Sequence, residues 1–278
     1  MSRIAGRFME LGERGRAAFI PFVTAGDPDF ETCASIIEKL PEMGADLIEI
    51  GVPFSDPMAD GPSIQAASLR ALNAGMSVPG VFELVRRFRR ADDATPIVLM
   101  GYFNPIHAYG IDRFVTDASA AGVDGLITVD LPPEEDAVLR VPASVKGIDV
   151  VRLATPTSDE MRLRRIAKEA SGFLYYVSVA GVTGTKSFAE ADLQNSLRSL
   201  KRITQLPCAV GFGIRTAEQA KNVARFADAV VIGSAIVQRI AAAVTSEMPS
   251  ASVIAETIGF CKMLADSVHA ARQISVVG

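Results

Sequence analysis

The sequence has few residues of the kinds that bind metals or form disulfides. It contains three cysteines and two histidines in 278 residues. Cys33, Cys208 and Cys261 are far apart, odd in number and without a CxxC pair, so neither a disulfide framework nor a zinc site is predicted. His107 and His269 do not cluster with cysteines or acidic residues, and no metal site is expected. This cysteine usage is typical of the cytoplasm.

The sequence also lacks an excess of basic residues and long apolar runs. With 28 Lys and Arg against 32 Asp and Glu, the net charge is −4, so the basic footprint of a nucleic-acid-binding protein is absent. No apolar run reaches about 18 residues, which argues against a membrane-spanning helix. Residues 1–16 alternate charged and apolar side chains, unlike a signal peptide. We therefore expect a cytoplasmic protein. Because its net charge is negative, a small anionic substrate would need hydrogen-bond donors at the binding site itself.

Short apolar runs, many of them β-branched, recur along the chain and predict eight buried strands. The runs are 18–23, 46–50, 96–100, 125–129, 149–154, 173–178, 208–211 and 229–232. They begin about 30 residues apart, which is the length of a βα unit. Between most of them, apolar residues recur at the spacing of a helix. This arithmetic predicts an α/β fold, a (β/α)8 TIM barrel in a single domain over 1–278. A doubly wound open sheet is the alternative, but no GxGxxG follows the first run.

Three segments depart from the regular repeat. Residues 1–16 are predicted to form an extra N-terminal helix that closes the bottom of the barrel. The two longest intervals between strands contain residues 51–62, rich in Pro, Gly and acids, and residues 179–190, which we expect to be a mobile loop after the sixth strand. Loops after strands lie on the C-terminal face of a barrel, where active sites are built.

Three small-residue turns follow the last three predicted strands: 181–184 (GVTG), 211–213 (GFG) and 233–235 (GSA). Each glycine could simply make a tight βα turn. Together they favour a phosphate cradle, because glycine lets backbone N–H groups approach an anion. The third turn is predicted to open a helix, whose N-terminus favours negative charge.

Acidic residues near the second strand suggest proton transfer. Glu49 lies between two isoleucines, where a carboxylate is costly unless it faces a functional cavity. Burial there would raise its pKa, as suits a general acid or base. Asp60 and Asp56 can each be explained as turn residues, because aspartate is common in turns. Asp27-Pro28 is interpreted as a helix N-cap followed by proline at the first helical position.

Aromatic residues fall at or near the ends of predicted strands and could line an apolar pocket at the barrel mouth, although such residues are often core. They are Phe22, Tyr102, Tyr175 and Phe212. Physical reasoning from the residues alone therefore predicts a barrel that binds a small phosphate ester carrying an apolar group.

The stretch IEIGVPFSDPMADGP at 48–62 closely resembles the signature of the tryptophan synthase α-subunit family. The similarity extends over nearly the whole chain. It includes FIPFVTAGDPD at 19–29, GYFNPI at 101–106, VDGLITVDLPPEE at 123–135, GVTG at 181–184, GFGI at 211–214 and GSAIV at 233–237.

This resemblance implies a lyase that cleaves indole-3-glycerol phosphate to indole and glyceraldehyde 3-phosphate. By the same resemblance, Glu49 is the acid/base group, Asp60 binds the indole N–H, and Tyr175 lies beside the acid/base. The implied phosphate-binding residues are Gly184, Gly213, Gly233 and Ser234. The implied residues of the indole pocket and its loop are Phe22, Ile64, Tyr102, Thr183 and Phe212.

The resemblance also implies partners and cofactors. The chain itself would need no cofactor or metal. Pyridoxal phosphate is expected only on a β subunit, which would take the indole for L-tryptophan biosynthesis in an α2β2 tetramer. The implied contact surface comprises Pro53–Pro57, Asn104–Ala108 and Pro132–Glu135.

Three other functions are possible from the sequence. A stand-alone lyase would release indole rapidly without a partner. An activator of the β subunit would have weak lyase activity of its own. A phosphosugar isomerase would need an acid/base pair on other strands, and the 48–62 signature argues against it.

Overall fold

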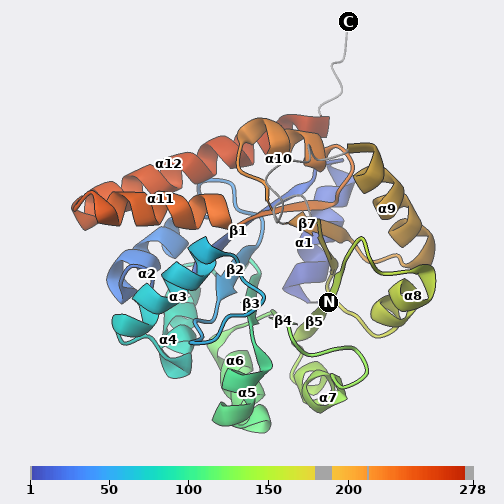
Figure 1. Ribbon diagram of the computed structural model, residues 1–278, viewed down its shortest axis with the longest axis horizontal. Coiled ribbons are helices and arrows are strands. Elements are labelled where there is room, and N and C mark those ends of the chain that lie inside the picture. Colours follow the sequence, from blue (N-terminus) through green and yellow to red (C-terminus); the bar gives the residue numbers. More distant parts are fainter. Residues whose placement is uncertain (1, 179–189, 212, 273–278) are drawn as a thin grey trace, which may run out of the picture.

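Eight parallel strands close into a barrel in chain order, which confirms the predicted (β/α)8 fold (Figure 1). The computed structural model describes residues 2–178, 190–211 and 213–272. The strands are β1 (Ala18–Thr24), β2 (Ile48–Gly51), β3 (Ile97–Gly101), β4 (Gly125–Thr128), β5 (Asp149–Ala154), β6 (Leu174–Val177), β7 (Cys208–Gly211) and β8 (Ala229–Ile232). All eight predicted strands are therefore present, with ends shifted by at most two residues.

Helices surround the barrel in Figure 1, and most of them cover the outer face of its strands. They are α1 (Arg3–Glu13), α2 (Phe30–Lys39), α3 (Pro62–Asn73), α4 (Val78–Arg89), α5 (Phe103–Tyr109), α6 (Ile111–Ala121), α7 (Ala137–Val145), α8 (Glu160–Lys168), α9 (Glu190–Ile203), α10 (Ala217–Ala224), α11 (Ser234–Thr245), α12 (Ser250–His269) and the short 3-10 helix η1 (Ala270–Arg272). Within the described ranges, none of them has both the length and the apolar character needed to cross a membrane.

The barrel interior is filled by side chains that alternate along the strands with those packed under the helices. The interior cluster includes Ile20, Leu47, Val98, Ile127, Val151, Phe173, Ala209 and Val231. Parallel strands buried on both faces explain the continuous apolar runs in the sequence.

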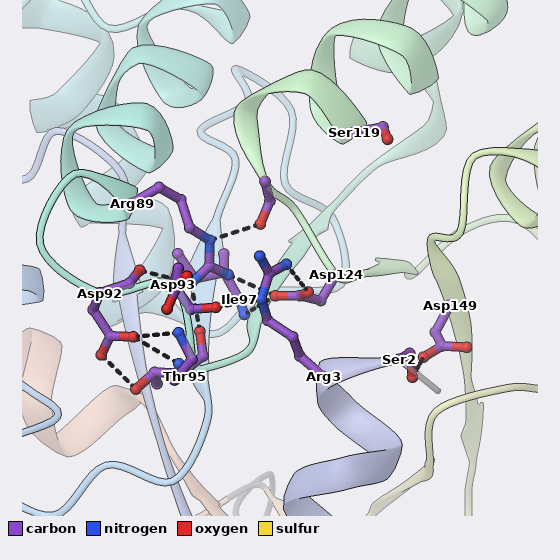
Figure 2. A network of polar contacts seen from close by, with 12 residues as sticks. Ser2, Arg3, Arg89, Asp92, Asp93, Thr95, Ile97, Ser119, Asp124 and Asp149 are labelled. Atoms are coloured by element: carbon purple, nitrogen blue, oxygen red, sulfur yellow. Dashed lines mark hydrogen bonds and ion pairs between the residues drawn. The ribbon is translucent and has the colours of Figure 1, made fainter.

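Helix α1 packs against this interior cluster through Ile4, Phe8 and Leu11, which are all buried. The ring of Phe8 lies 5.7 Å from that of Phe173, at the start of β6. Ser2 caps α1 by accepting a hydrogen bond from the Ala5 N–H and donates to Asp149 at 2.7 Å (Figure 2). The helix is thus attached where the strands begin, opposite the C-terminal face.

A buried carboxylate links α1 and α4 to the lower end of the barrel. Asp124 accepts hydrogen bonds from Arg3 at 2.9 Å, from Arg89 at 2.6 Å and from the Ile97 N–H at 2.8 Å (Figure 2). Arg89 also donates to the carbonyls of Gly122 and Thr95. The arginine charge is nearly inaccessible to solvent, so it depends on this carboxylate.

The interpretation of Asp27-Pro28 as a helix cap is wrong. Helix α2 begins two residues later, and Asp29 caps it by accepting hydrogen bonds from the N–H and hydroxyl of Thr32. Asp27 is instead buried and accepts two hydrogen bonds from Arg70 of α3, at 2.8 and 2.9 Å. The cap lies two residues later than predicted, and the role of Asp27 is decided by Arg70, a distant residue that local sequence patterns do not reveal.

We expect Asp124→Ala to lower the free energy of unfolding by about 3 kcal/mol, because it leaves the buried Arg89 charge without a counter-ion. Urea denaturation followed by circular dichroism measures the change. Arg86→Ala, on the exposed side of the same helix α4, is the matched control and should change stability by less than about 0.5 kcal/mol. Equal losses in the two variants would contradict a special role of the Asp124 network.

Candidate active site

A cavity of about 330 Å³ opens at the carboxyl ends of the strands. It is lined by eight of the residues that the sequence analysis singled out: Phe22, Glu49, Asp60, Ile64, Tyr175, Gly213, Gly233 and Ser234. Tyr102 lines a small adjoining cavity together with Phe22, Asp60 and Ile64. Thr183, Gly184 and Phe212 lie outside the described residues, as does the expected mobile loop over 179–190 except for Glu190, which begins α9.

Glu49 carries a buried carboxyl group at the base of the cavity. Its position on β2, opposite Phe22 of β1, directs the side chain into the barrel. The residue is 1% exposed, and its Oε2 atom has no hydrogen-bond partner among the described residues. Burial, together with the nearby Asp60 carboxylate, raises the pKa of Glu49 to about 8. A carboxyl group with this pKa can both give and take a proton near neutral pH.

Asp60 is held at the opposite side of the opening by Tyr102, the residue after β3. The Tyr102 hydroxyl donates to Asp60 Oδ2 at 3.1 Å and accepts a hydrogen bond from the Ala59 N–H at 2.9 Å. Partial burial raises the pKa of Asp60, while the Tyr102 hydrogen bond opposes that rise. Gln65 of α3 donates to the Asp60 carbonyl at 2.8 Å. These contacts fix the position of a carboxylate that comes from an irregular loop.

Tyr175 projects into the cavity from β6 and is buried. Burial, with the Glu49 carboxylate nearby, raises the pKa of its hydroxyl well above the usual value, so it stays protonated. A side chain at position 211 of the neighbouring strand would collide with this hydroxyl. Gly211 therefore makes room for Tyr175, a role that the sequence analysis missed by assigning the whole 211–213 turn to phosphate.

The apolar wall of the cavity is built in a similar way around Phe22. A Cβ atom at Gly51 would lie 2.5 Å from the Phe22 ring, and one at Gly233 would lie 3.1 Å from it. Phe22 also belongs to a small apolar cluster with Ile64 and Met100. The three residues form a surface suited to a flat hydrocarbon ring.

The other end of the cavity has donors suited to an anion. Gly213 has φ +76°, a conformation that side chains other than glycine rarely adopt. Gly233 is the N-cap of α11 but provides no side-chain cap, and Ser234 is the first helical residue. The N-terminus of α11 therefore presents backbone N–H groups and a hydroxyl to this part of the cavity.

Further residues of the lining did not stand out in the sequence. They include Met100, Val129, Leu153, Thr155, Val177, Arg215, Val231 and Gln238. Most lie at the carboxyl ends of strands, so the alternation of inward and outward side chains could have found them once the strand ends were known. Arg215 could have been found as the charged residue two positions after Gly213.

No group of three or more His, Cys, Asp or Glu side chains in the described part of the chain is arranged to hold a metal ion. The polar groups that line the cavity are instead two carboxyls, a phenol, hydroxyls, the Gln238 amide, the Arg215 guanidinium and backbone N–H groups. They can exchange protons at one end and bind an anion at the other.

Comparison with known proteins identifies the family. The sequence model of the tryptophan synthase alpha chain matches residues 8–268. The chain belongs to this family. The structure is similar to tryptophan synthase subunit alpha from Legionella pneumophila strain Paris, with 38% identity, a TM-score of 0.89, and coverage of 96% of this chain and 98% of that one. It is also similar to tryptophan synthase from Mycobacterium tuberculosis in an open form, with 32% identity, a TM-score of 0.85, and coverage of 97% and 99%.

Members of the tryptophan synthase alpha chain family are lyases that cleave indole-3-glycerol phosphate. The resemblance seen in the sequence is therefore confirmed, as is the enzyme class. An apolar wall, two carboxyls and an anion-binding end in a single cavity suit an indole ring joined through a glycerol chain to a phosphate.

Glu49 should make the stability of this family member depend on pH. Its pKa of about 8 in the folded chain exceeds the ordinary value of 4.5, so the native state binds the proton more tightly than the unfolded state. The stabilisation is complete below about pH 4.5 and is lost as pH rises to about 8. We expect Glu49→Gln to gain stability relative to the parent over this range, by a few kcal/mol.

Urea denaturation at pH 5.5 and pH 8.5 measures this difference. Glu83→Gln, in an exposed ion-paired position on α4, is the control and should show no such trend. A parent-to-variant difference that is the same at both pH values would show that Glu49 titrates normally.

Proposed function

We propose that this cavity cleaves indole-3-glycerol phosphate, with Glu49 as the acid/base, Asp60 on the indole N–H and the phosphate at the α11 end. The observation that carries the proposal is the buried Glu49 carboxyl, which has a pKa of about 8 in a cavity shared with Asp60 and an oxygen that no described residue hydrogen-bonds. The indole ring lies against Phe22 and Ile64. The phosphate lies against Gly213, Gly233 and Ser234, and against Gly184.

Cleavage needs two proton transfers, and a carboxyl group with a pKa near neutrality can carry out both of them. Protonated Glu49 gives its proton to C3 of the indole, which turns the ring into a cation with its charge on the nitrogen. The resulting carboxylate takes the proton of the adjacent glycerol hydroxyl. The C–C bond then breaks, its electron pair returns to the ring, and indole and glyceraldehyde 3-phosphate result.

Asp60 stabilises the cation by accepting a hydrogen bond from the indole N–H. A carboxylate in a partly buried site stabilises nearby positive charge more strongly than one in water. The Tyr102 hydroxyl keeps Asp60 oriented toward the cavity. Tyr175, which stays neutral, contributes a polar edge beside Glu49. The family resemblance assigns Thr183 to the loop and Phe212 to the indole pocket, and both lie outside the described residues.

The reaction moves only protons and one electron pair, so these side chains supply all the groups that it requires. We infer that the chain works without a metal or an organic cofactor. Pyridoxal phosphate belongs to the β subunit, which joins the released indole to an amino acid. The three buried free cysteines support a reducing, cytoplasmic location.

We infer an α2β2 assembly in which the β subunit covers one side of the barrel mouth. The contact segments Pro53–Pro57, Asn104–Ala108 and Pro132–Glu135 follow β2, β3 and β4, which are neighbours in the barrel. The three segments therefore lie on adjacent parts of the same rim. Met58, the residue directly after the segment Pro53–Pro57, is 84% exposed, which is unusual for an apolar side chain without a partner.

We expect Glu49→Gln to reduce indole release from indole-3-glycerol phosphate at least about 100-fold, because shape is kept while proton transfer is lost. Indole is measured with the purified chain alone and after addition of a β subunit. Slow release that accelerates with β supports the α-subunit function, and rapid release without β supports a stand-alone lyase. Turnover by Glu49→Gln close to that of the parent would remove Glu49 from the reaction.

We expect Met58→Glu to weaken binding of the β subunit by roughly tenfold, since it places a charge at the edge of the proposed interface, next to Pro57. Titration of the chain with a β subunit, followed by calorimetry, measures the affinity. Met263→Glu is the matched control, because Met263 is an exposed methionine on α12, away from the three loops. A similar affinity for both variants would place the interface elsewhere.

A further inference from the structure

The cavity has an unbalanced charge distribution. Among its lining residues that the structure describes, Arg215 is the only one with a cationic side chain, whereas Glu49 and Asp60 both carry carboxyl groups. The whole chain has a net charge of −4. Glu49 is mostly protonated near neutral pH, so the Asp60 carboxylate and the net charge of the chain are what oppose a doubly charged phosphate ester, unless a local cation offsets them.

The backbone around Arg215 is fixed beside the anion-binding end. Arg215 follows Gly213 by two residues in the loop between β7 and α10. Its N–H donates to Gln219 Oε1 at 2.8 Å, and the Thr216 N–H donates to the same atom at 3.2 Å. Thr216 and Gln219 form the capping box of α10. The start of the arginine side chain is thus held in place by the helix that follows.

The guanidinium group of Arg215 is exposed and has no ion-pair or hydrogen-bond partner within residues 2–178, 190–211 and 213–272. Arg239 offers a contrast on the neighbouring helix α11. It lies 3.9 Å from a Glu256 oxygen and 4.9 Å from the centre of the Phe260 ring. Arg215 lines both the main cavity and the groove that contains Arg239, so it lies at the rim between them. Its charge is therefore available to a ligand.

We propose that Arg215 binds the phosphate group of the substrate and offsets the negative charge of the cavity. This inference rests on the proposed function, in which the phosphate lies at Gly213, Gly233 and Ser234. The backbone N–H groups and the Ser234 hydroxyl orient the phosphate through hydrogen bonds. Arg215 adds a full positive charge from the open side of the cradle. A guanidinium suits this task because its N–H groups can reach two phosphate oxygens.

The position of Arg215 predicts an effect on binding and not on chemistry. The phosphate keeps its charge throughout the reaction and is separated from the broken C–C bond by the glycerol chain. Its contact with Arg215 therefore stabilises the bound substrate and the transition state equally. Loss of the contact should raise KM and leave kcat unchanged.

The test compares Arg215→Gln, Arg215→Lys and the matched control Arg239→Gln in the full chain. KM and kcat for indole-3-glycerol phosphate are measured at low and high ionic strength. Binding of glycerol 3-phosphate and of indole is measured separately by calorimetry. Both substituted side chains are on the surface, and thermal denaturation checks that each of the three variants is folded.

We expect Arg215→Gln to raise KM and the dissociation constant for glycerol 3-phosphate about tenfold, the usual effect of one charge-assisted hydrogen bond. Indole binding and kcat should be unchanged. Arg215→Lys should retain much of the affinity, and the dependence of KM on ionic strength should weaken in Arg215→Gln. Arg239→Gln should behave as the parent.

Three outcomes would overturn the inference: no change in glycerol 3-phosphate binding for Arg215→Gln, an equal change for Arg239→Gln, or a fall in kcat at constant KM. Failure of the proposed function is recognised separately, because the parent chain would then release no indole. Glycerol 3-phosphate binding needs no turnover and would still decide whether Arg215 holds the anion.

Discussion

The chemistry of the site depends on one constraint: the barrel closes around the Glu49 carboxyl and leaves one of its oxygens without a hydrogen-bond partner in the part of the chain that the structure describes. In water such a group is ionised at neutral pH, and burial, with a smaller contribution from the Asp60 carboxylate, makes its protonated form stable there. The closed barrel provides that burial because strands and side chains surround the cavity floor from all sides. A reactive carboxyl is therefore obtained at a cost in stability, which the large core and the network around Asp124 can offset.

Glycines shape the cavity as much as its aromatic side chains do. Gly51 and Gly233 leave space for Phe22, and Gly211 leaves space for the Tyr175 hydroxyl. Gly233 also begins the anion-binding end at α11, so one small residue serves both the apolar wall and the phosphate cradle. A side chain at position 233 would displace the Phe22 ring and also obstruct the helix N-terminus. One substitution would therefore disturb both ends of the substrate site.

Most of the fold could be predicted from the sequence, because strands buried on both faces have continuous apolar runs. These runs can be recognised without knowledge of the tertiary contacts. Glu49 stood out for the same reason, as a carboxyl in such a run. The structure was needed where long-range contacts decide the role of a residue. Asp27 looks like a helix cap until its partner Arg70 is seen, and Gly211 looks like a phosphate turn until the Tyr175 hydroxyl is found beside it.

The cavity separates two electrostatic tasks along its length. The Glu49 end must stay poor in positive charge, because a nearby cation would favour the carboxylate and lower its pKa toward the ordinary value. The phosphate end requires the opposite, a positive field that water and salt do not screen completely. Helix α11 meets this requirement with partial charges that fade within one helical turn. A full cation at the outer rim, on the loop after β7, can add attraction for the phosphate while the substrate itself lies between it and the acid/base.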